Sequence, residues 1–563
     1  MLLFRLVQRW TAVLVAIVLL NLSLTFYNVW PTPRIRWQGH LSAELAAVIV
    51  GLAVWLGASR VAGPGGRTGP RRRVVKVLAA AWVALVIGRY LDVMAPALYG
   101  RPINLYWDAR HLSAVASMLT DSIPPLMIAG ALTAVVAGLV IAYFAARWAW
   151  GAVAASLAHA WDRRILASVA AVLLAVWGAE RLSSFTPAHP QFSPTVSQAY
   201  WRHARILGTQ LVSHSAAVVT SRQATESDLQ HVRGADVYLV FVESYGAVSY
   251  DRRDVVDRIA PQRAQFDRDV RASGRQVVSA FVDSPTFGGS SWLAHVTLMT
   301  GVEARDEDTN VLLMSQQRDT LVSTFARQGY RTVALMPGLT KRWPEGAFYR
   351  FDHVYDTAQL AYAGPRFGWW TVPDQFALAR LDLLEHEQQR EGQGTRFVFF
   401  PTTSTHAPFG PTAPYQPDWV RVVSDDPYAE PDVRDALAHT PNYEDLGPSY
   451  ASAVSYAYSS IGGYLQRHAD RDLVMIMLGD HQPAAAVSGA NASWDVPVHV
   501  IASRPELLNR LRAHGFHDGM TPPRRAIGSM HELLPTLLDA FGNRSQNRDH
   551  PAVGVGSPLV SGE

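Results

Sequence analysis

The sequence predicts a chain of two parts: an N-terminal transmembrane domain of five helices, then an α/β domain whose mainly parallel sheet is covered by helices on both faces. Three observations lead to this fold class. Of 563 residues, 49% are hydrophobic and only 17% are charged, and the apolar excess is concentrated in residues 1–182. Within that part, five segments have the length of membrane spans. From residue 235 on, short apolar runs alternate with longer amphipathic ones.

The transmembrane domain occupies residues 1–182. The five spans are expected at 11–29, 41–59, 77–97, 123–146 and 164–182. A cleaved signal peptide is the alternative for the first span, but no small-residue cleavage site follows it and four further spans do. We therefore expect the first span to be a membrane anchor.

Basic residues predict how the chain is oriented. The loop between the second and third spans, "SRVAGPGGRTGPRRRVVK", has five Arg, one Lys and no acidic residue, and the start "MLLFRLVQRW" has two Arg. Cytoplasmic loops carry such an excess of basic residues. With five spans both stretches lie on the same side, so the N-terminus is predicted to be cytoplasmic and everything after residue 182 extracytoplasmic.

The segment after the last span predicts a juxtamembrane connector over 183–234. It is rich in Ser, Thr, Pro and His and contains short helical patterns such as "SQAYWRHARILGTQL". The α/β domain is then expected over 235–545, with a C-terminal tail at 546–563.

Apolar runs and amphipathic patterns alternate through this domain. Strands are expected at 236–243, 276–283, 331–337, 396–403, 472–479 and 496–503. Helices are expected near 252–273, 291–300, 316–328, 375–389, 448–468, 504–514 and 529–541. In such sheets ligands bind beyond the carboxyl ends of the strands, so the residues at those ends are the first candidates for a site.

Side chains able to bind a metal or a substrate stand at the ends of three of these strands. Glu243 ends the first strand, His406 follows the fourth in "PTTSTHAPF", and Asp480 and His481 end the fifth in "VMIMLGDHQP". Each alone is an ordinary cap or turn residue. Together at one edge of a sheet, carboxylates and an imidazole suit a divalent ion such as Zn²⁺ or Mn²⁺.

The second strand leads into "DSPTFGGSSWLAHVTLMTG". Its two glycines permit a tight turn, and Ser291 stands at the start of a predicted helix, where free N–H groups and the helix dipole stabilise an anion. Such a serine is either a simple N-cap or, beside a metal, a nucleophile toward phosphorus or sulfur. The other ligands favour Ser291 as the nucleophile, with Ser290 as the alternative.

The composition excludes several classes of function. The chain has no cysteine, which rules out disulfides, thiolate metal sites and a cysteine nucleophile. A net charge of +3 is too small to indicate nucleic-acid binding.

Four motifs, "VFVESYG", "GGSSWLAHVTLMTG", "TTSTHAPF" and "LGDHQP", resemble in the same order those of the alkaline phosphatase and sulfatase superfamily. More closely, the layout of spans, connector and exported domain resembles its membrane-anchored branch of lipoteichoic acid synthases and phosphoethanolamine transferases. The resemblance implies a sulfatase-like catalytic domain on the periplasmic or extracellular side of a bacterial inner membrane.

The resemblance also implies roles for single residues. Glu243, Asp480, His481 and the oxygen of Ser291 would hold one divalent metal, Mn²⁺ or Zn²⁺ with Mg²⁺ as an alternative, and His406 would bind the substrate or leaving group. The segment "TKRWPEGAFYRFDHVYD" resembles a region that contacts the head group, with Arg342 and Trp343 as candidates. The segment "GWWTVPDQF" resembles the one that follows, and its Asp374 is assigned no chemistry.

The implied activity is transfer of a phosphoglycerol-type head group from a membrane phospholipid to a glycan or lipid acceptor, through a phospho-serine. Disulfides of the phosphoethanolamine branch are impossible without cysteine, which favours phosphoglycerol. Phosphoethanolamine transfer, hydrolysis by a phosphodiesterase or phosphatase, and a non-catalytic membrane scaffold that binds a cell-envelope glycan are the alternatives. The acceptor and the oligomeric state stay open.

Overall fold

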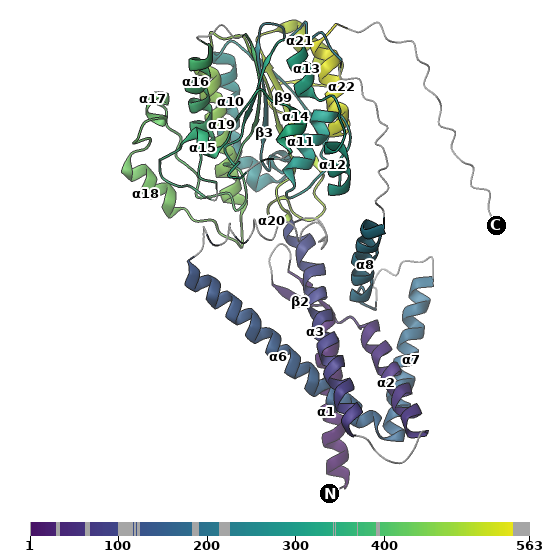
Figure 1. Cartoon of the computed structure of the whole chain (residues 1–563). Helices are drawn as coiled ribbons and strands as arrows, with labels where there is room; N and C mark the ends of the chain where they lie inside the picture. Colours follow the sequence, from purple (N-terminus) through teal and green to yellow (C-terminus); the bar gives the residue numbers. More distant parts are fainter. Residues whose placement is uncertain are drawn as a thin grey trace, which may run out of the picture. The chain divides into compact units, whose positions relative to one another are not determined.

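The computed structural model of the chain (Figure 1) describes residues 2–29, 34–61, 68–99, 116, 120, 124–182, 191–212, 226–389 apart from 342, 344 and 369, and 394–543. The chain forms two compact units, residues 1–217 with 484–491 and residues 218–483 with 492–563. The predicted tail at 546–563 lies outside the described residues.

Five apolar helices of the first unit occupy the predicted spans. They are α1 (Leu2–Leu24), α2 (Ala43–Val61), α3 (Thr68–Tyr99), α6 (Pro125–Leu157) and α7 (Ala160–Leu182). Among the described residues, α1, α3, α6 and α7 contain stretches long and apolar enough to cross a membrane, whereas the apolar stretch of α2, Ala43–Ala58, is shorter. The predicted N-terminal helical region is therefore confirmed, with four helices of spanning length and one shorter helix.

The helix ends differ from the predicted spans. The basic run at 71–76, predicted as loop, lies inside α3, because Arg, Lys and Val after Pro70 continue a helix once it has begun. The first span ends early, since β1 (Phe26–Asn28) pairs antiparallel with β2 (Ile35–Trp37).

The predicted connector contains α8 (Val196–Val212), which packs on α3 within the first unit. Tyr200 donates a hydrogen bond from its hydroxyl to the Ala84 carbonyl at 2.7 Å. Arg202 pairs with Asp92 at 3.3 Å. Gly88 permits this approach, because a Cβ there would lie 2.5 Å from the Tyr200 ring.

The second unit is built on an eight-stranded sheet of order β10-β4-β9-β8-β3-β7-β5-β6. Six strands confirm the predicted ones, while β6 and β10 are too short to leave a sequence pattern. The strands are β3 (Asp236–Val242), β4 (Gln276–Asp283), β5 (Arg331–Leu335), β6 (His353–Tyr355), β7 (Arg396–Pro401), β8 (Leu473–Gly479), β9 (Asp495–Ala502) and β10 (His517–Asp518).

Strand directions bring the candidate residues to one edge. Strands β8, β3, β7, β5 and β6 run parallel. Strand β9 is antiparallel to both β8 and β4, so β4 runs in the same direction as β8. The carboxyl ends of β3, β4, β7 and β8 therefore lie at the same edge of a mainly parallel sheet, which we call the catalytic rim.

Helices cover both faces of the sheet (Figure 1). One face carries α10 (Arg253–Ala272), α16 (Asp374–Gln389) and α19 (Gly447–Arg467), and the other carries α11 (Ser291–Thr300), α13 (Leu321–Arg327), α21 (Pro505–Ala513) and α22 (Met530–Phe541). Shorter helices occur in the connecting segments: α9 (Val248–Asp251), α12 (Glu307–Met314), α14 (Gly346–Tyr349), α15 (Thr357–Leu360), α17 (Trp419–Val422), α18 (Glu430–Ala438) and α20 (Ala485–Ser488).

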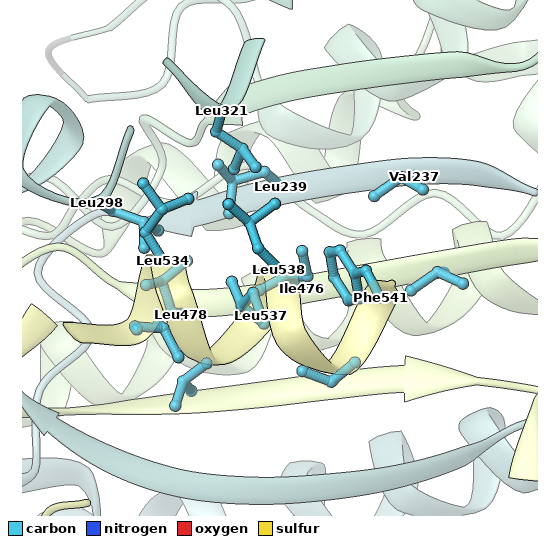
Figure 2. Packing of buried hydrophobic residues seen from close by; sticks show 14 of the residues in the cluster. Val237, Leu239, Leu298, Leu321, Ile476, Leu478, Leu534, Leu537, Leu538 and Phe541 are labelled. Carbon is cyan, nitrogen blue, oxygen red and sulfur yellow. The ribbon is translucent and has the colours of Figure 1, made fainter. Parts of the chain in front are cut away.

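The main hydrophobic core lies between the sheet and α22. Figure 2 shows Leu239 of β3 and Ile476 and Leu478 of β8 packed against Leu534 and Leu538. Alternate side chains of the same strands point to the opposite face, where Tyr238 shares a 2.8 Å hydrogen bond with Tyr464 of α19. Burial on both faces explains the continuous apolar runs in the sequence.

A buried polar cluster on the α10 and α19 face contains His499 of β9. Its Nδ1 lies 2.6 Å from Ser279 Oγ and its Nε2 lies 3.1 Å from the Tyr245 hydroxyl. Burial, together with the positive charge of Arg263, lowers the pKa of His499 to about 3. The folded chain therefore keeps this imidazole neutral in acid that protonates an ordinary histidine.

We expect this histidine to weaken the fold in acid. Below a pH of about 6.5 histidine in the unfolded chain binds a proton, whereas folded His499 stays neutral until the pH reaches its lowered pKa. The unfolding free energy therefore decreases as the pH is lowered, by up to about 1.4 kcal/mol per pH unit. Chemical denaturation of the detergent-solubilised chain between about pH 6 and 4 should show a flatter dependence in His499→Gln than in the wild type. The exposed His439→Gln is the control, and equal slopes in the two variants would contradict the assignment.

Candidate metal centre

Three predicted metal ligands meet at the catalytic rim. Glu243 follows β3, while Asp480 and His481 follow the neighbouring β8, whose Gly479 pairs with Val242. Their ligand atoms all lie within 4.8 Å of one another. His481 Nε2 is 3.3 Å from Glu243 Oε1 and 3.6 Å from Asp480 Oδ2. The side chains are 13%, 1% and 1% exposed for Glu243, Asp480 and His481, so the group is shielded from water.

Ser291 lies against this group. Its hydroxyl donates to Glu243 Oε2 at 2.8 Å and lies 3.3 Å from His481 Nε2. The turn after β4 places it there: Ser290 has a left-handed φ of +65° immediately before α11, which begins at Ser291. Among the described residues, Ser291 is thus the serine of the "GGSSW" motif whose hydroxyl contacts the proposed ligands.

The backbone around the ligands fixes their orientation. Asp480 Oδ1 accepts hydrogen bonds from the Ser244 and His481 amides at 2.8 and 2.7 Å. His481 Nδ1 donates to the Gln482 carbonyl at 2.7 Å, which directs Nε2 toward the carboxylates. Gly479 allows the strand ends to approach, because a Cβ there would lie 1.8 Å from the Tyr245 carbonyl oxygen.

These residues fit a divalent metal. Asp480 Oδ2 is buried and has no hydrogen-bond partner among the described residues, which is costly unless a cation or donor satisfies it. Two carboxylates, one imidazole nitrogen and one hydroxyl are the oxygen and nitrogen donors that Zn²⁺ and Mn²⁺ accept.

Electrostatics within the group are strongly coupled. Burial opposes charge on the imidazole, but Asp480 and Glu243 outweigh it and raise the pKa of His481 to about 9. Burial and the charge of Glu243 raise the pKa of Asp480 well above its ordinary value. Burial also disfavours charge on Glu243, yet the interaction with His481 holds the pKa of Glu243 far below its usual range. A positive charge among the three side chains is therefore strongly favoured.

His406 lies on the loop after β7 and belongs to the same neighbourhood. Its charge contributes to lowering the pKa of Glu243. Thr402 on the same loop accepts a hydrogen bond from the Glu243 amide at 3.1 Å. His406 Nδ1 lies 2.7 Å from the Ala407 carbonyl oxygen, to which it donates a hydrogen bond.

Trp343, one of the two predicted head-group contacts, lies in an aromatic cluster. Trp343 stacks on Tyr349 at 5.7 Å between ring centroids and packs near Phe351. In the described part of the chain Trp343 packs within this cluster, and its contact with a head group stays a prediction. Arg342 lies outside the described residues.

Sequence reasoning missed several supporting residues. Ser244 adopts a left-handed φ of +56° and donates both to Asp480 and, through its hydroxyl, to Glu243 Oε1. Gln482 accepts a hydrogen bond from the Val248 amide with its side-chain oxygen and one from the Gly288 amide with its backbone carbonyl. The available signal was their position, because both directly follow a predicted ligand.

Comparison with known proteins identifies the domain. Residues 294–542 match the sulfatase family, a region that includes His406, Asp480 and His481 and begins just after Ser291. No curated protein sequence matches the chain.

Solved structures with a similar fold were also found. They include the integral membrane lipooligosaccharide phosphoethanolamine transferase A (EptA) from Neisseria meningitidis, at 14% identity, with 89% of this chain and 88% of that chain covered and a TM-score of 0.44. The lipoteichoic acid synthase LtaP from Listeria monocytogenes matches at 13% identity over 60% and 79% of the chains, with a TM-score of 0.36. The phosphoglycerol transferase GacH from Streptococcus pyogenes, in complex with sn-glycerol-1-phosphate, matches at 12% identity over 55% and 76%, with a TM-score of 0.36.

The family match over 294–542 and the site at the catalytic rim agree with each other. The second unit of this chain is therefore an enzyme domain of the alkaline phosphatase and sulfatase superfamily.

Proposed function

We propose that this protein is a metal-dependent phosphotransferase that moves a phosphoglycerol-type head group from a membrane phospholipid to a glycan or lipid acceptor. The observation that carries the proposal is the Ser291 hydroxyl, held 2.8 Å from Glu243 and 3.3 Å from His481 at the start of a helix. A hydroxyl among metal ligands at a helix N-terminus is suited to attack an anionic phosphodiester. The four apolar helices of spanning length supply access to a lipid donor.

A divalent ion held by Glu243, Asp480 and His481 would lower the pKa of the Ser291 hydroxyl and neutralise the charge of the phosphodiester. Mn²⁺ and Zn²⁺ suit these ligands, with Mg²⁺ as an alternative. The absence of cysteine supports a catalytic serine used directly as the nucleophile.

In the first step, Ser291 Oγ forms a bond to phosphorus while the bond from phosphorus to the diacylglycerol oxygen breaks. The Ser291 proton passes to solvent, and the departing oxygen gains a proton from His406 Nε2. In the second step, an acceptor hydroxyl gives its proton to His406 and forms the new bond to phosphorus. The bond between phosphorus and Ser291 Oγ then breaks, and the serine oxygen regains a proton from solvent. Both steps pass through one covalent phospho-serine, which predicts ping-pong kinetics.

We further propose that the catalytic unit, starting near residue 235 after a connector at 183–234, lies on the outer side of a bacterial inner membrane. The arginine-rich stretch at 71–73 and the two arginines near the N-terminus support a cytoplasmic N-terminus. The outer leaflet then provides the donor at the membrane surface.

Mass spectrometry of the Ser291 peptide tests the proposal. The detergent-solubilised chain is loaded with Mn²⁺ or Zn²⁺, incubated with phosphatidylglycerol and denatured. We expect a phosphoglycerol adduct on Ser291 and release of diacylglycerol. A phosphoethanolamine adduct formed only from phosphatidylethanolamine would reassign the head group. Lipid cleavage without a serine adduct would contradict the covalent route, and loss of the adduct to water as fast as to an acceptor would indicate a hydrolase.

A further inference from the structure

A small pocket opens at the catalytic rim beside His406. Its lining residues come from two stretches: Phe367, Gly368, Trp370 and Pro373 stand just before α16, and eight residues between Thr403 and Ala413 follow β7. Trp370 stands edge-to-face against His406, with ring centroids 5.6 Å apart and planes at 89°. His406 thus belongs both to the neighbourhood of Glu243 and to the wall of the pocket.

The lining of this pocket has a distinctive chemistry. Its apolar wall consists of aromatic rings and prolines, and its polar wall of hydroxyls and the His406 imidazole. None of its lining residues, all of which the structure describes, is Asp, Glu, Lys or Arg. An ammonium or phosphate group that entered would lose its hydration without a counter-charge, and one indole replaces only a small part of that loss. An uncharged, hydroxylated group fits, since its carbon atoms pack on rings while its hydroxyls bond to Ser404, Thr412 and His406.

Asp374, at the start of α16, joins the two walls. Its Oδ1 accepts hydrogen bonds from the Thr403 amide at 2.8 Å and the Thr403 hydroxyl at 3.3 Å, and its Oδ2 accepts from the Ser404 amide at 3.1 Å. In return, the Asp374 amide donates to the Ser404 hydroxyl at 3.3 Å. Thr403 also donates to the Val372 carbonyl at 3.3 Å. The segment before α16 is thus joined to the loop that carries Thr402 and His406.

The burial of Asp374 is unusual. The residue is only 2% exposed, and among the described residues the carboxylate has hydrogen-bond donors from Thr403 and Ser404 but no ion pair with Arg or Lys. A buried carboxylate without a cation costs folding free energy. The Asp374 carboxylate fixes the position of the 402–406 loop, which contacts Glu243 through Thr402 and carries His406.

We propose that this pocket binds the uncharged polyol group of a substrate, with Trp370 as a specificity-determining wall and Asp374 as the positioning residue that holds the two walls together. The inference rests on the proposed function, because the polyol is attached to, or receives, the phosphoryl group carried by Ser291. Two sources share this chemistry: the glycerol head group of the donor lipid and a sugar of the acceptor.

Trp370→Ala separates these sources in the full-length protein. The donor arm measures how fast the Ser291 adduct forms from phosphatidylglycerol and from phosphatidylethanolamine with identical acyl chains. The acceptor arm measures how fast the adduct disappears when octyl glucoside is added as the probe acceptor in a non-glycosidic detergent. The variant should slow one arm by about tenfold or more. If the donor arm slows, the ratio of the adduct-formation rate from phosphatidylglycerol to that from phosphatidylethanolamine should also decrease. Wild-type rates in both arms would overturn the proposal, and Tyr443→Ala, an exposed aromatic of the same unit, is the control.

Asp374→Asn tests the positioning role. The amide keeps the size of the side chain but turns hydrogens toward a backbone N–H, so the arm affected by Trp370→Ala should show a KM raised by about tenfold. Bound metal and melting temperature should match those of Asp382→Asn, a variant on the same helix whose side chain contacts Tyr464 and His468. Kinetics equal to those of Asp382→Asn, or loss of metal in Asp374→Asn, would overturn the role given to Asp374.

The same experiment separates this inference from the proposed function. No Ser291 adduct from any phospholipid in the wild-type protein would refute both. If the wild-type protein forms the Ser291 adduct, and Trp370→Ala and Asp374→Asn form and transfer it at the wild-type rate, only the role of the pocket would be refuted.

Discussion

Ser291→Ala is expected to abolish adduct formation and to reduce head-group transfer by at least about 10³-fold, because the variant has no nucleophile for the phosphodiester. The hydroxyl of Ser291 contacts both Glu243 and His481, whereas Ser290 occupies the left-handed turn before α11. Bound metal should remain, since Glu243, Asp480 and His481 are unchanged. Diacylglycerol release and metal content, measured on the same preparation, check both statements.

Ser290→Ala is the matched control for this prediction. It removes a neighbouring hydroxyl from the same turn, where the backbone has a φ of +65°, and should retain most of the activity. A larger loss in Ser290→Ala than in Ser291→Ala, at equal melting temperatures, would instead assign the nucleophile to Ser290.

Asp480→Asn is expected to remove metal binding while leaving the metal-free fold as stable as the wild type, or more stable. In the wild type the Asp480 and Glu243 carboxylates are buried beside each other, and Asp480 Oδ2 has no partner among the described residues. Asparagine keeps the oxygen that accepts from Ser244 and His481 and removes the like charge. Activity should fall by at least about 10²-fold, since the metal loses one ligand.

Thermal unfolding with chelator and with added Mn²⁺ or Zn²⁺ measures this effect. The wild type should gain melting temperature on metal addition because metal binds the folded state, and Asp480→Asn should gain little. Asp472→Asn, at the other end of the same strand and paired with Arg504, should behave like the wild type. Metal-dependent stabilisation of Asp480→Asn equal to that of the wild type would contradict the ligand assignment.

Much of the fold could be predicted from the sequence because burial leaves a local record. Strands covered on both faces become continuous apolar runs, as in "DVYLVFV" of β3 and "LVMIMLG" of β8. Segments of membrane-spanning length have few charges for the same reason. Strands β6 and β10 and helix α12 were missed because two or three residues, or one short helix with mixed polarity, leave no periodic pattern.

The site was predicted in part. Glu243, Asp480 and His481 could be found because each directly follows a strand, and parallel strands end at one edge. Ser244, Gln482 and Asp374 could not, because their roles depend on hydrogen bonds to residues far away in the sequence, such as the bond from the Ser244 amide to Asp480. The edge-to-face contact of Trp370 with His406 is equally invisible in a linear pattern.

The sequence by itself determined the apolar helices, the mainly parallel α/β domain and the order of the motifs that supply an acid, a serine and an Asp-His pair. These features depend on local composition and periodicity, which each segment carries on its own. Only the tertiary structure decided that Ser291 lies against Glu243 and His481, that Asp480 Oδ2 has no hydrogen-bond partner among the described residues, and that Asp374 joins the walls of the pocket beside His406. Those relations arise where the ends of β3, β4, β7 and β8 meet, and the distances between such side chains are set by strand order, which no local stretch of sequence encodes.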